Sequence, residues 1–297
     1  MEAKGGLLGP VDILKFWARK FLRLAPAYYF MWIFMLGLIA RLGEGPIWNF
    51  TDMDFEQCKR QWLPTFFFFG NIIPSIMPPY TGCYQFAWPL QLDLQIALFV
   101  PLIAMIYWKS RVAGNTLMFL FILTNIAVNM YYSYTYDLKI GFVHTNNFYL
   151  LQAIISKPWT KTQNIGFAFI MVDIYFQILA YRKVKTEQEK SIRFPSLHKI
   201  HTTPWIGNSL ILFGIALIFT NLFFCTHWNA NPFDASKFGN AAYWGISRPS
   251  WVLGICSILL AIFTGHFNKA KGFLSTNNMR LISKSVAVGT VFELAVI

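Results

Sequence analysis

Apolar and polar residues alternate along this chain in blocks long enough to predict membrane-spanning helices. The mostly apolar stretches are residues 24–42, 87–108, 113–136, 163–181, 207–227 and 243–266. Roughly 20 mostly apolar residues are enough to cross the hydrocarbon core of a bilayer. A further apolar stretch, residues 281–297, is too short for a full crossing. We therefore predict an all-α, polytopic transmembrane bundle with six full spans and one partial span, forming a single domain over residues 1–297.

Two segments outside these spans also have a recognisable pattern. Residues 11–23 read VDILKFWARKFLR and form a basic, amphipathic approach to the membrane. We expect a separate span to start at residue 24, with Pro26 in its first turn, where a missing N–H is tolerated. Residues 43–86 form a long connection whose second part, residues 62–79, is aromatic and broken by prolines. We expect that second part to lie in the membrane interface.

Composition supports a membrane protein and excludes an ordinary soluble domain. Hydrophobic residues make up 56% of the chain, and charged residues only 13%, about half of the roughly 25% typical of soluble domains. The net charge of +12 would suggest a nucleic-acid partner in a soluble protein. Here the Lys and Arg residues lie between apolar spans, so membrane orientation and contact with anionic lipids explain them. We expect membrane lipids as partners and no nucleic acid.

The loop charges also predict an orientation. Sixteen Lys and Arg residues fall on one side of the membrane, in residues 1–23, 109–111, 182–206 and 267–280, against six on the other side. The positive-inside rule places the richer side in the cytoplasm or its topological equivalent. Residues 43–86 then form a non-cytoplasmic loop.

That loop carries two features typical of an oxidising, glycosylating compartment. Asn49-Phe50-Thr51 is a glycosylation sequon, with Asn49 as the acceptor, and Cys58 and Cys83 lie in the same loop. We expect a Cys58–Cys83 disulfide, with two unbridged thiols as the alternative. An endomembrane or the plasma membrane fits these features best, and an organelle inner membrane is the alternative location.

The span at residues 87–108 holds the polar group of greatest interest. Asp93 lies there, with Gln91 and Gln95 on either side. An acidic residue in a spanning helix costs about 2.5–3.5 kcal/mol on insertion scales, so such residues usually face a bundle interior or a wet cavity and mark a site. We expect Asp93 to face a cavity and to be the best catalytic candidate of the chain. The alternative is a hydrogen-bonded helix brace.

Asp173 offers a second polar position inside a span. Asp173 and Gln177 are one turn apart in residues 163–181. They predict either a polar path for an acceptor or acyl group, or an interhelical hydrogen bond, which is worth about 0.6 kcal/mol.

A basic cluster precedes the first span. Arg19 and Lys20 precede Arg23 by four and three residues, so the three cations cluster on one face of a helix. Three cations at a cytoplasmic membrane surface suit the phosphates of an acyl-CoA, which bind through charge-assisted hydrogen bonds. The alternative is a positive-inside anchor. No paired metal-ligand spacing occurs, so we expect no metal site, and none of the five histidines predicts a catalytic base: His144, His198, His201, His227 and His266.

Several short motifs occur in a consistent order along the chain. The first is Lys20-x-x-Arg23-x-x-Pro26-x-Tyr28. The later ones are Cys58…Trp62…FFFFGN, Cys83…Trp88-x-Leu-x-x-Asp93-x-Gln95, Lys157-Pro158-Trp159-Thr160-Lys161, Arg248-Pro249-Ser250-Trp251 and Gly272-Phe273-Leu274-Ser275. This series resembles the membrane acyltransferase type 3 family, in particular its nose-resistant-to-fluoxetine branch, over nearly all 297 residues.

The resemblance implies an integral-membrane O-acyltransferase. Acyl-CoA would be the donor substrate, held by Arg19, Lys20 and Arg23, and a lipid or another hydroxyl compound the acceptor. No permanently bound cofactor is implied. The site would be lined by residues from several motifs and spans: Tyr28, Trp88, Gln91, Gln95, Asp173, Arg248 and Trp251.

The chain also departs from the family pattern. The family's first helices, with a His implicated in catalysis, and its closing Tyr-Leu-x-His motif have no counterpart in this sequence. We therefore expect either a fragment of a longer protein or a member that has lost its chemistry. Two other functions stay open at this point: an inactive structural subunit packed against other membrane proteins, and a transporter of lipids or small molecules.

Overall fold

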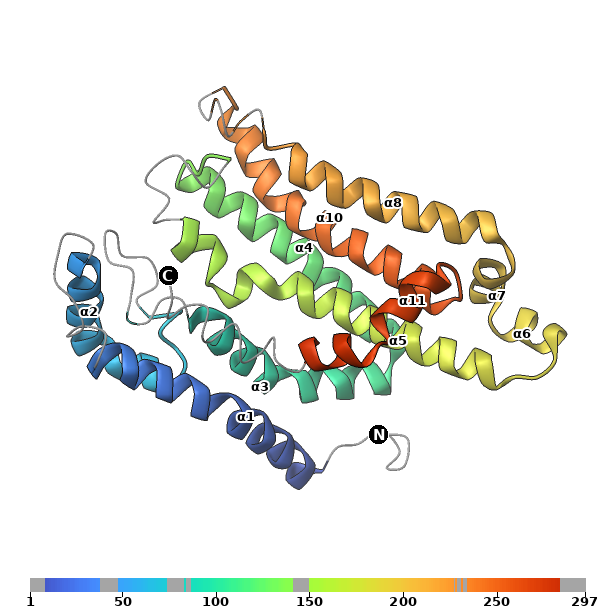
Figure 1. The fold of residues 1–297 in the computed structure, drawn as a ribbon, viewed down its shortest axis with the longest axis horizontal. Coiled ribbons are helices and arrows are strands. Elements are labelled where there is room, and N and C mark those ends of the chain that lie inside the picture. Colours follow the sequence, from blue (N-terminus) through green and yellow to red (C-terminus); the bar gives the residue numbers. More distant parts are fainter. Residues whose placement is uncertain are drawn as a thin grey trace. The chain divides into compact units, whose positions relative to one another are not determined.

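The computed structural model describes residues 9–37, 48–73, 83, 87–140, 150–226, 228, 231 and 234–283. Every regular element among these residues is a helix, as predicted (Figure 1). The chain divides into two compact units, and each is described by itself. The first unit contains residues 1–115, 146–160 and 282–297, and the second contains residues 116–145 and 161–281.

The helices of the first unit surround an aromatic core. They are α1 (Pro10–Gly37), α2 (Trp48–Phe66), α3 (Trp88–Lys109) and the π-helical turn η4 (Leu150–Ile155), with the 3₁₀ turn η5 (Pro158–Lys161) at the boundary. Tyr28 of α1 stacks on Phe68, with their ring centroids 4.1 Å apart. Around this pair the buried core is drawn from α1, α2, α3 and the segments between them: Leu24, Ala25, Met31, Trp32, Cys58, Cys83, Ala87 and Leu90.

The second unit is built from longer helices and their short connections. They are α4 (Arg111–Thr135, of which residues 111–115 belong to the first unit), α5 (Thr162–Lys183), α6 (Glu187–Arg193), α7 (Pro195–Thr202), α8 (Pro204–Phe223), α10 (Lys237–Phe263) and α11 (Asn268–Leu274). α8 and α10 run side by side (Figure 1). A Cβ on Gly214 would lie 2.6 Å from the carbonyl oxygen of Gly254. The two backbones therefore meet through small residues, as is common between membrane helices.

Five helices have the length and apolar composition needed to cross a membrane. They are Trp88–Lys109, Arg111–Thr135, Pro158–Lys183, Pro204–Phe223 and Lys237–Phe263. These helices confirm a multi-pass membrane protein and coincide with five of the six predicted full spans. The remaining predicted span, residues 24–42, lies partly in α1, and most of the predicted partial span at residues 281–297 lies outside the described residues.

The predicted break before the first span was wrong. α1 runs without interruption from Pro10 to Gly37, so Pro26 lies in the middle of a helix and not in a first turn. A proline inside a helix costs roughly 3 kcal/mol. Tertiary contacts on both sides of Pro26 hold the helix together: Trp17 Nε1 donates to Ala97 O of α3 at 3.1 Å, and Tyr28 Oη donates to Thr65 O at 2.7 Å.

The predicted connection at residues 43–86 contains a helix and the expected disulfide. α2 occupies Trp48–Phe66, with a backbone break at Gln61 (φ −120°, ψ 22°). Cys58 and Cys83 are bonded, which confirms that prediction, and their Cα atoms lie 4.3 Å apart. Trp32 Nε1 of α1 lies 3.3 Å from Cys83 Sγ, so the bridge is joined to the core. Asn49 lies in the first turn of α2, but its side chain is outside the described part of the structure.

Candidate functional site

Asp93 has a charged partner on a neighbouring helix. Its Oδ2 lies 2.7 Å from Nζ of Lys20 on α1, and the two side chains are 48% and 24% exposed. A carboxylate in a spanning helix is costly without a partner, and the Lys20 ammonium provides one. The carboxylate is half exposed, and the ammonium of Lys20 compensates its charge. The pair joins the predicted catalytic residue to one of the predicted phosphate-binding residues, and both roles stay predictions.

The other two predicted phosphate-binding residues differ from Lys20 in their surroundings. Arg19 and Arg23 are exposed on α1, whereas Lys20 is partly covered and paired with Asp93. The basic face of α1 therefore presents two guanidinium groups outward. Arginine holds phosphate oxygens through two parallel hydrogen bonds, so these two positions suit a phosphate-bearing ligand better than lysine would.

A buried hydrogen-bonded network lies behind this face, between α1, α3 and the end of α2. Gln91 Nε2 donates to Tyr28 Oη at 2.9 Å, and Tyr28 Oη donates in turn to Thr65 O at 2.7 Å. All three side chains are buried. Within the described residues, Thr65 Oγ1 has no hydrogen-bond partner. A Cβ on Gly70 would lie 2.9 Å from that oxygen and 3.1 Å from Gln91 Nε2, so glycine is required for the close approach.

A second group of buried hydrogen bonds is centred on Gln95. Phe68, whose ring stacks on Tyr28 and whose carbonyl oxygen accepts from Gln95, links the two groups into what we call the buried network. Gln95 Nε2 donates to Phe68 O at 2.6 Å and to Asn71 Oδ1 at 2.7 Å, and Asn71 Nδ2 donates to Ser156 O at 2.9 Å. Both amide side chains are buried. Buried polar groups of this kind are costly unless each is paired. The hydrogen bonds therefore hold α3, residues 68–71 and the 150–160 segment in one arrangement.

Lys157 completes the network, and sequence reasoning missed it as a site residue. Its side chain is 2% exposed, and Nζ donates to Asn71 O at 2.6 Å. Nζ also lies 5.9 Å from the centre of the Trp159 ring. Burial lowers the pKa of Lys157 from 10.5 to about 8. A signal was present in the sequence, because Lys157 is one of few cations on the predicted non-cytoplasmic side and is followed directly by Pro158.

The remaining predicted site residues do not all join this network. Trp88 begins α3 in the first unit. Asp173, Arg248 and Trp251 belong to the second unit, on α5 and α10. Asp173 Oδ2 accepts a hydrogen bond from Gln177 Nε2 at 2.7 Å, one turn away on the same helix. The guanidinium of Arg248 lies 5.7 Å from the ring centre of Trp244, also one turn away.

Three of the histidines have structural partners at helix ends. His201 Nδ1 is hydrogen-bonded to Thr264 O beyond α10, and His266 Nε2 to Ile200 O. His198 Nδ1 lies 3.1 Å from Tyr181 Oη. His144 and His227 lie outside the described residues. Where the structure describes the chain, no group of three or more His, Cys, Asp or Glu could hold a metal ion.

Comparison with known proteins identified no relative of this chain. The chain matches no protein-family profile, no curated protein and no solved structure among those compared. The resemblance described above therefore rests on its motifs alone.

Proposed function

We propose that this protein is an integral-membrane O-acyltransferase-like protein, which transfers an acyl group from acyl-CoA to the hydroxyl of a lipid or another acceptor. One observation carries the proposal. Residues from separate motifs of the resemblance meet in one buried network: Tyr28, Asn71, Gln91, Gln95 and Lys157. Polar side chains in membrane proteins commonly bond between helices, and here they join segments that carry separate motifs of the resemblance. A network that joins distant segments supports a functional unit.

The division of roles follows from exposure and charge. Arg19 and Arg23, exposed on α1, bind the phosphates of the donor. Asp93 holds the Lys20 ammonium beside them through the 2.7 Å ion pair. The buried network, including Lys157, positions α1 and α3 and is not itself in contact with the donor phosphates.

We also propose which helices cross the membrane and on which side the amino terminus lies. α1 has 28 residues and is about 42 Å long at 1.5 Å per residue, enough for a basic end in the headgroup layer and an apolar end in hydrocarbon. α1 would then be the sixth full span, residues 281–297 the partial one, and the amino terminus cytoplasmic.

Binding of a non-hydrolysable acyl-CoA analogue to the purified protein in nanodiscs tests the proposal. The double variant Arg19→Ala/Arg23→Ala should weaken binding by at least about tenfold, because hydrogen bonds to charged groups contribute about 1.5–3 kcal/mol each. The matched control is Lys269→Ala/Lys271→Ala, which removes two exposed cations of α11 on the same predicted side. Equal weakening in both variants, or none in the first, would reject the phosphate-binding role.

A second arm of the same experiment concerns Asp93. In an acyl-transfer assay, Asp93→Asn should lower turnover while changing analogue binding only a few-fold, since a half-exposed ion pair contributes about 0–1 kcal/mol. Unchanged turnover in that variant would leave Asp93 as a helix brace.

A further inference from the structure

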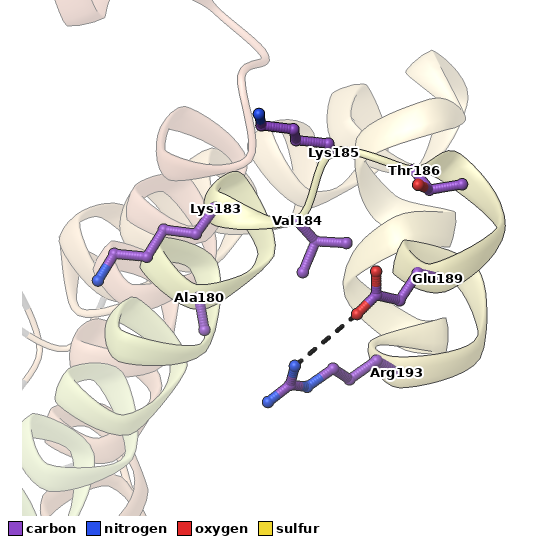
Figure 2. A pocket seen from close by; sticks show the side chains of 7 residues that line it. All are labelled: Ala180, Lys183, Val184, Lys185, Thr186, Glu189 and Arg193. Carbon is purple, nitrogen blue, oxygen red and sulfur yellow. Dashed lines mark ion pairs between the residues drawn. The ribbon is translucent and has the colours of Figure 1, made fainter.

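A cavity of about 500 Å³ lies in the second unit, where α5 ends and α6 begins. Seven residues line it: Ala180, Lys183, Val184, Lys185, Thr186, Glu189 and Arg193 (Figure 2). Figure 2 shows Arg193 reaching from α6 back toward the end of α5, with Val184 pointing into the space between them. Nothing in the proposed acyl-transfer site uses these residues.

The lining of the cavity is strongly basic. Lys183, Lys185 and Arg193 contribute three positive charges, and Glu189 one negative charge. The nearest atoms of Glu189 and Arg193 are 4.0 Å apart, and both side chains are exposed. An ion pair with this geometry contributes little. Arg193 therefore remains able to turn its guanidinium toward an anion in the cavity.

The cavity lies beside the end of a candidate membrane span. The candidate span that contains α5 ends at Lys183, and the next candidate span begins at Pro204. The chain between them, including α6 and α7, therefore stays at one membrane surface. Ile192 of α6 and Trp205 of α8 are 81% and 77% exposed. Exposed apolar and Trp side chains next to the ends of spans are typical of residues that enter the interface.

We propose that this cavity binds the phosphate of an anionic lipid headgroup, with the acyl chains of the lipid lying along α5. Arg193 binds the phosphate oxygens through charge-assisted hydrogen bonds. Lys183 and Lys185, whose side chains point away from Arg193 in Figure 2, turn toward the phosphate by rotation about their flexible side-chain bonds when the lipid binds. Ala180 and Val184 provide an apolar wall for the glycerol backbone. The phosphate group itself could equally come from a soluble compound. The position of the cavity at the end of a span favours a lipid, because basic pockets at this depth meet headgroups of the cytoplasmic leaflet.

The test measures lipid binding by the full-length chain in nanodiscs. The discs contain phosphatidylcholine alone or phosphatidylcholine with phosphatidic acid, and bound phosphatidic acid is quantified by native mass spectrometry after release. Lys183→Gln/Lys185→Gln/Arg193→Gln should lower the affinity for phosphatidic acid by about fivefold for each charge removed. Glu189→Gln should raise that affinity, because it removes the negative charge of the lining. Both variants replace exposed side chains, and a thermal unfolding scan checks that they remain folded.

The control variant separates a site from a general charge effect. Lys199→Gln/Lys269→Gln/Lys271→Gln removes three exposed cations of the same unit that do not line the cavity. This control should retain the affinity of the unmodified protein. An equal loss in the two triple variants would overturn the proposal, and so would an unchanged affinity in the cavity variant.

The source of the phosphate is tested by competition. Glycerol 3-phosphate, a soluble compound with the same phosphate, should not displace phosphatidic acid at equal concentration. Displacement would overturn the assignment to a lipid. The outcome is independent of the acyl-transfer proposal, since Arg19→Ala/Arg23→Ala should leave phosphatidic acid binding unchanged.

Discussion

The two units use polar side chains in different ways. In the first unit, Gln91 and Gln95 on α3 bond to segments that are distant in the sequence. In the second unit, Asn129 donates to Asn125 on its own helix, and Gln177 donates to Asp173 on its own helix. The second unit also has long-range polar contacts, between Asn221 Nδ2 of α8 and Ser250 Oγ of α10 at 2.8 Å, and at helix ends, as between His201 and Thr264 O.

This difference indicates where the chain depends on tertiary hydrogen bonds. A side chain that bonds along its own helix holds no second segment in place, so its replacement affects one local partner. A side chain that joins two segments leaves buried partners without hydrogen bonds when it is removed. The first unit should therefore be the more sensitive to polar substitutions, and three experiments test that contrast.

The largest effect is expected from the disulfide. Cys58→Ala/Cys83→Ala should lower the free energy of unfolding by about 3.5 kcal/mol, because the bridge closes a loop with a sequence separation of 25 residues. Cys225→Ala/Cys256→Ala is the control in the second unit, where neither cysteine is disulfide-bonded. Thermal unfolding in detergent measures both. Equal destabilisation by the two double variants would contradict the assigned role of the bridge.

A somewhat smaller effect is expected from the charge of Lys157. Its folded pKa, lowered to about 8 by burial, lies below the ordinary 10.5 of the unfolded chain. The unfolded chain therefore binds more protons between these values, and stability must rise as the pH increases through that window. As the pH rises through this window, the free energy of unfolding of the native protein should increase by up to about 3 kcal/mol relative to that of Lys157→Met.

Unfolding temperatures of both proteins at pH ~7 and ~10 measure this shift. Comparison with Lys157→Met cancels the titration of other groups. If the unfolding temperatures of the two proteins differ by the same amount at both pH values, the ammonium group is not buried in the folded state.

The smallest effect compares two buried amides directly. Gln95→Leu should cost about 2 kcal/mol, because Phe68 O and Asn71 Oδ1 lose their donor. Asn129→Leu should cost only about 0.6 kcal/mol, because it takes the donor from one buried oxygen, Asn125 Oδ1, and at the same time removes Asn129 Oδ1, which is buried without a hydrogen-bond partner among the described residues. Unfolding temperatures rank the two variants, and a larger effect at Asn129 would remove the contrast between the units.

Some features of the candidate site could be predicted from residues that are close in sequence. The triplet Gln91, Asp93 and Gln95 marked α3 as the polar helix because such residues are rare in spans. Asp93, the most conspicuous of the three, proved to be half exposed and paired with Lys20. Gln91 and Gln95, which resemble ordinary hydrogen-bonding residues in the sequence, hold the buried network together. Charge drew attention to Asp93, whereas its two neighbours make the buried hydrogen bonds, since burial depends on the partner that packs against each face.

The sequence by itself determined the five apolar helices, because the cost of exposing polar groups to hydrocarbon forces long apolar blocks to become spans. It also determined the bridged pair Cys58 and Cys83, since both cysteines lie in one predicted non-cytoplasmic loop. Only the tertiary structure decided that α1 continues through Pro26 and that Lys157 reaches Asn71. Both depend on contacts between residues far apart in the chain, and local hydrophobic periodicity contains no information on which distant groups will meet.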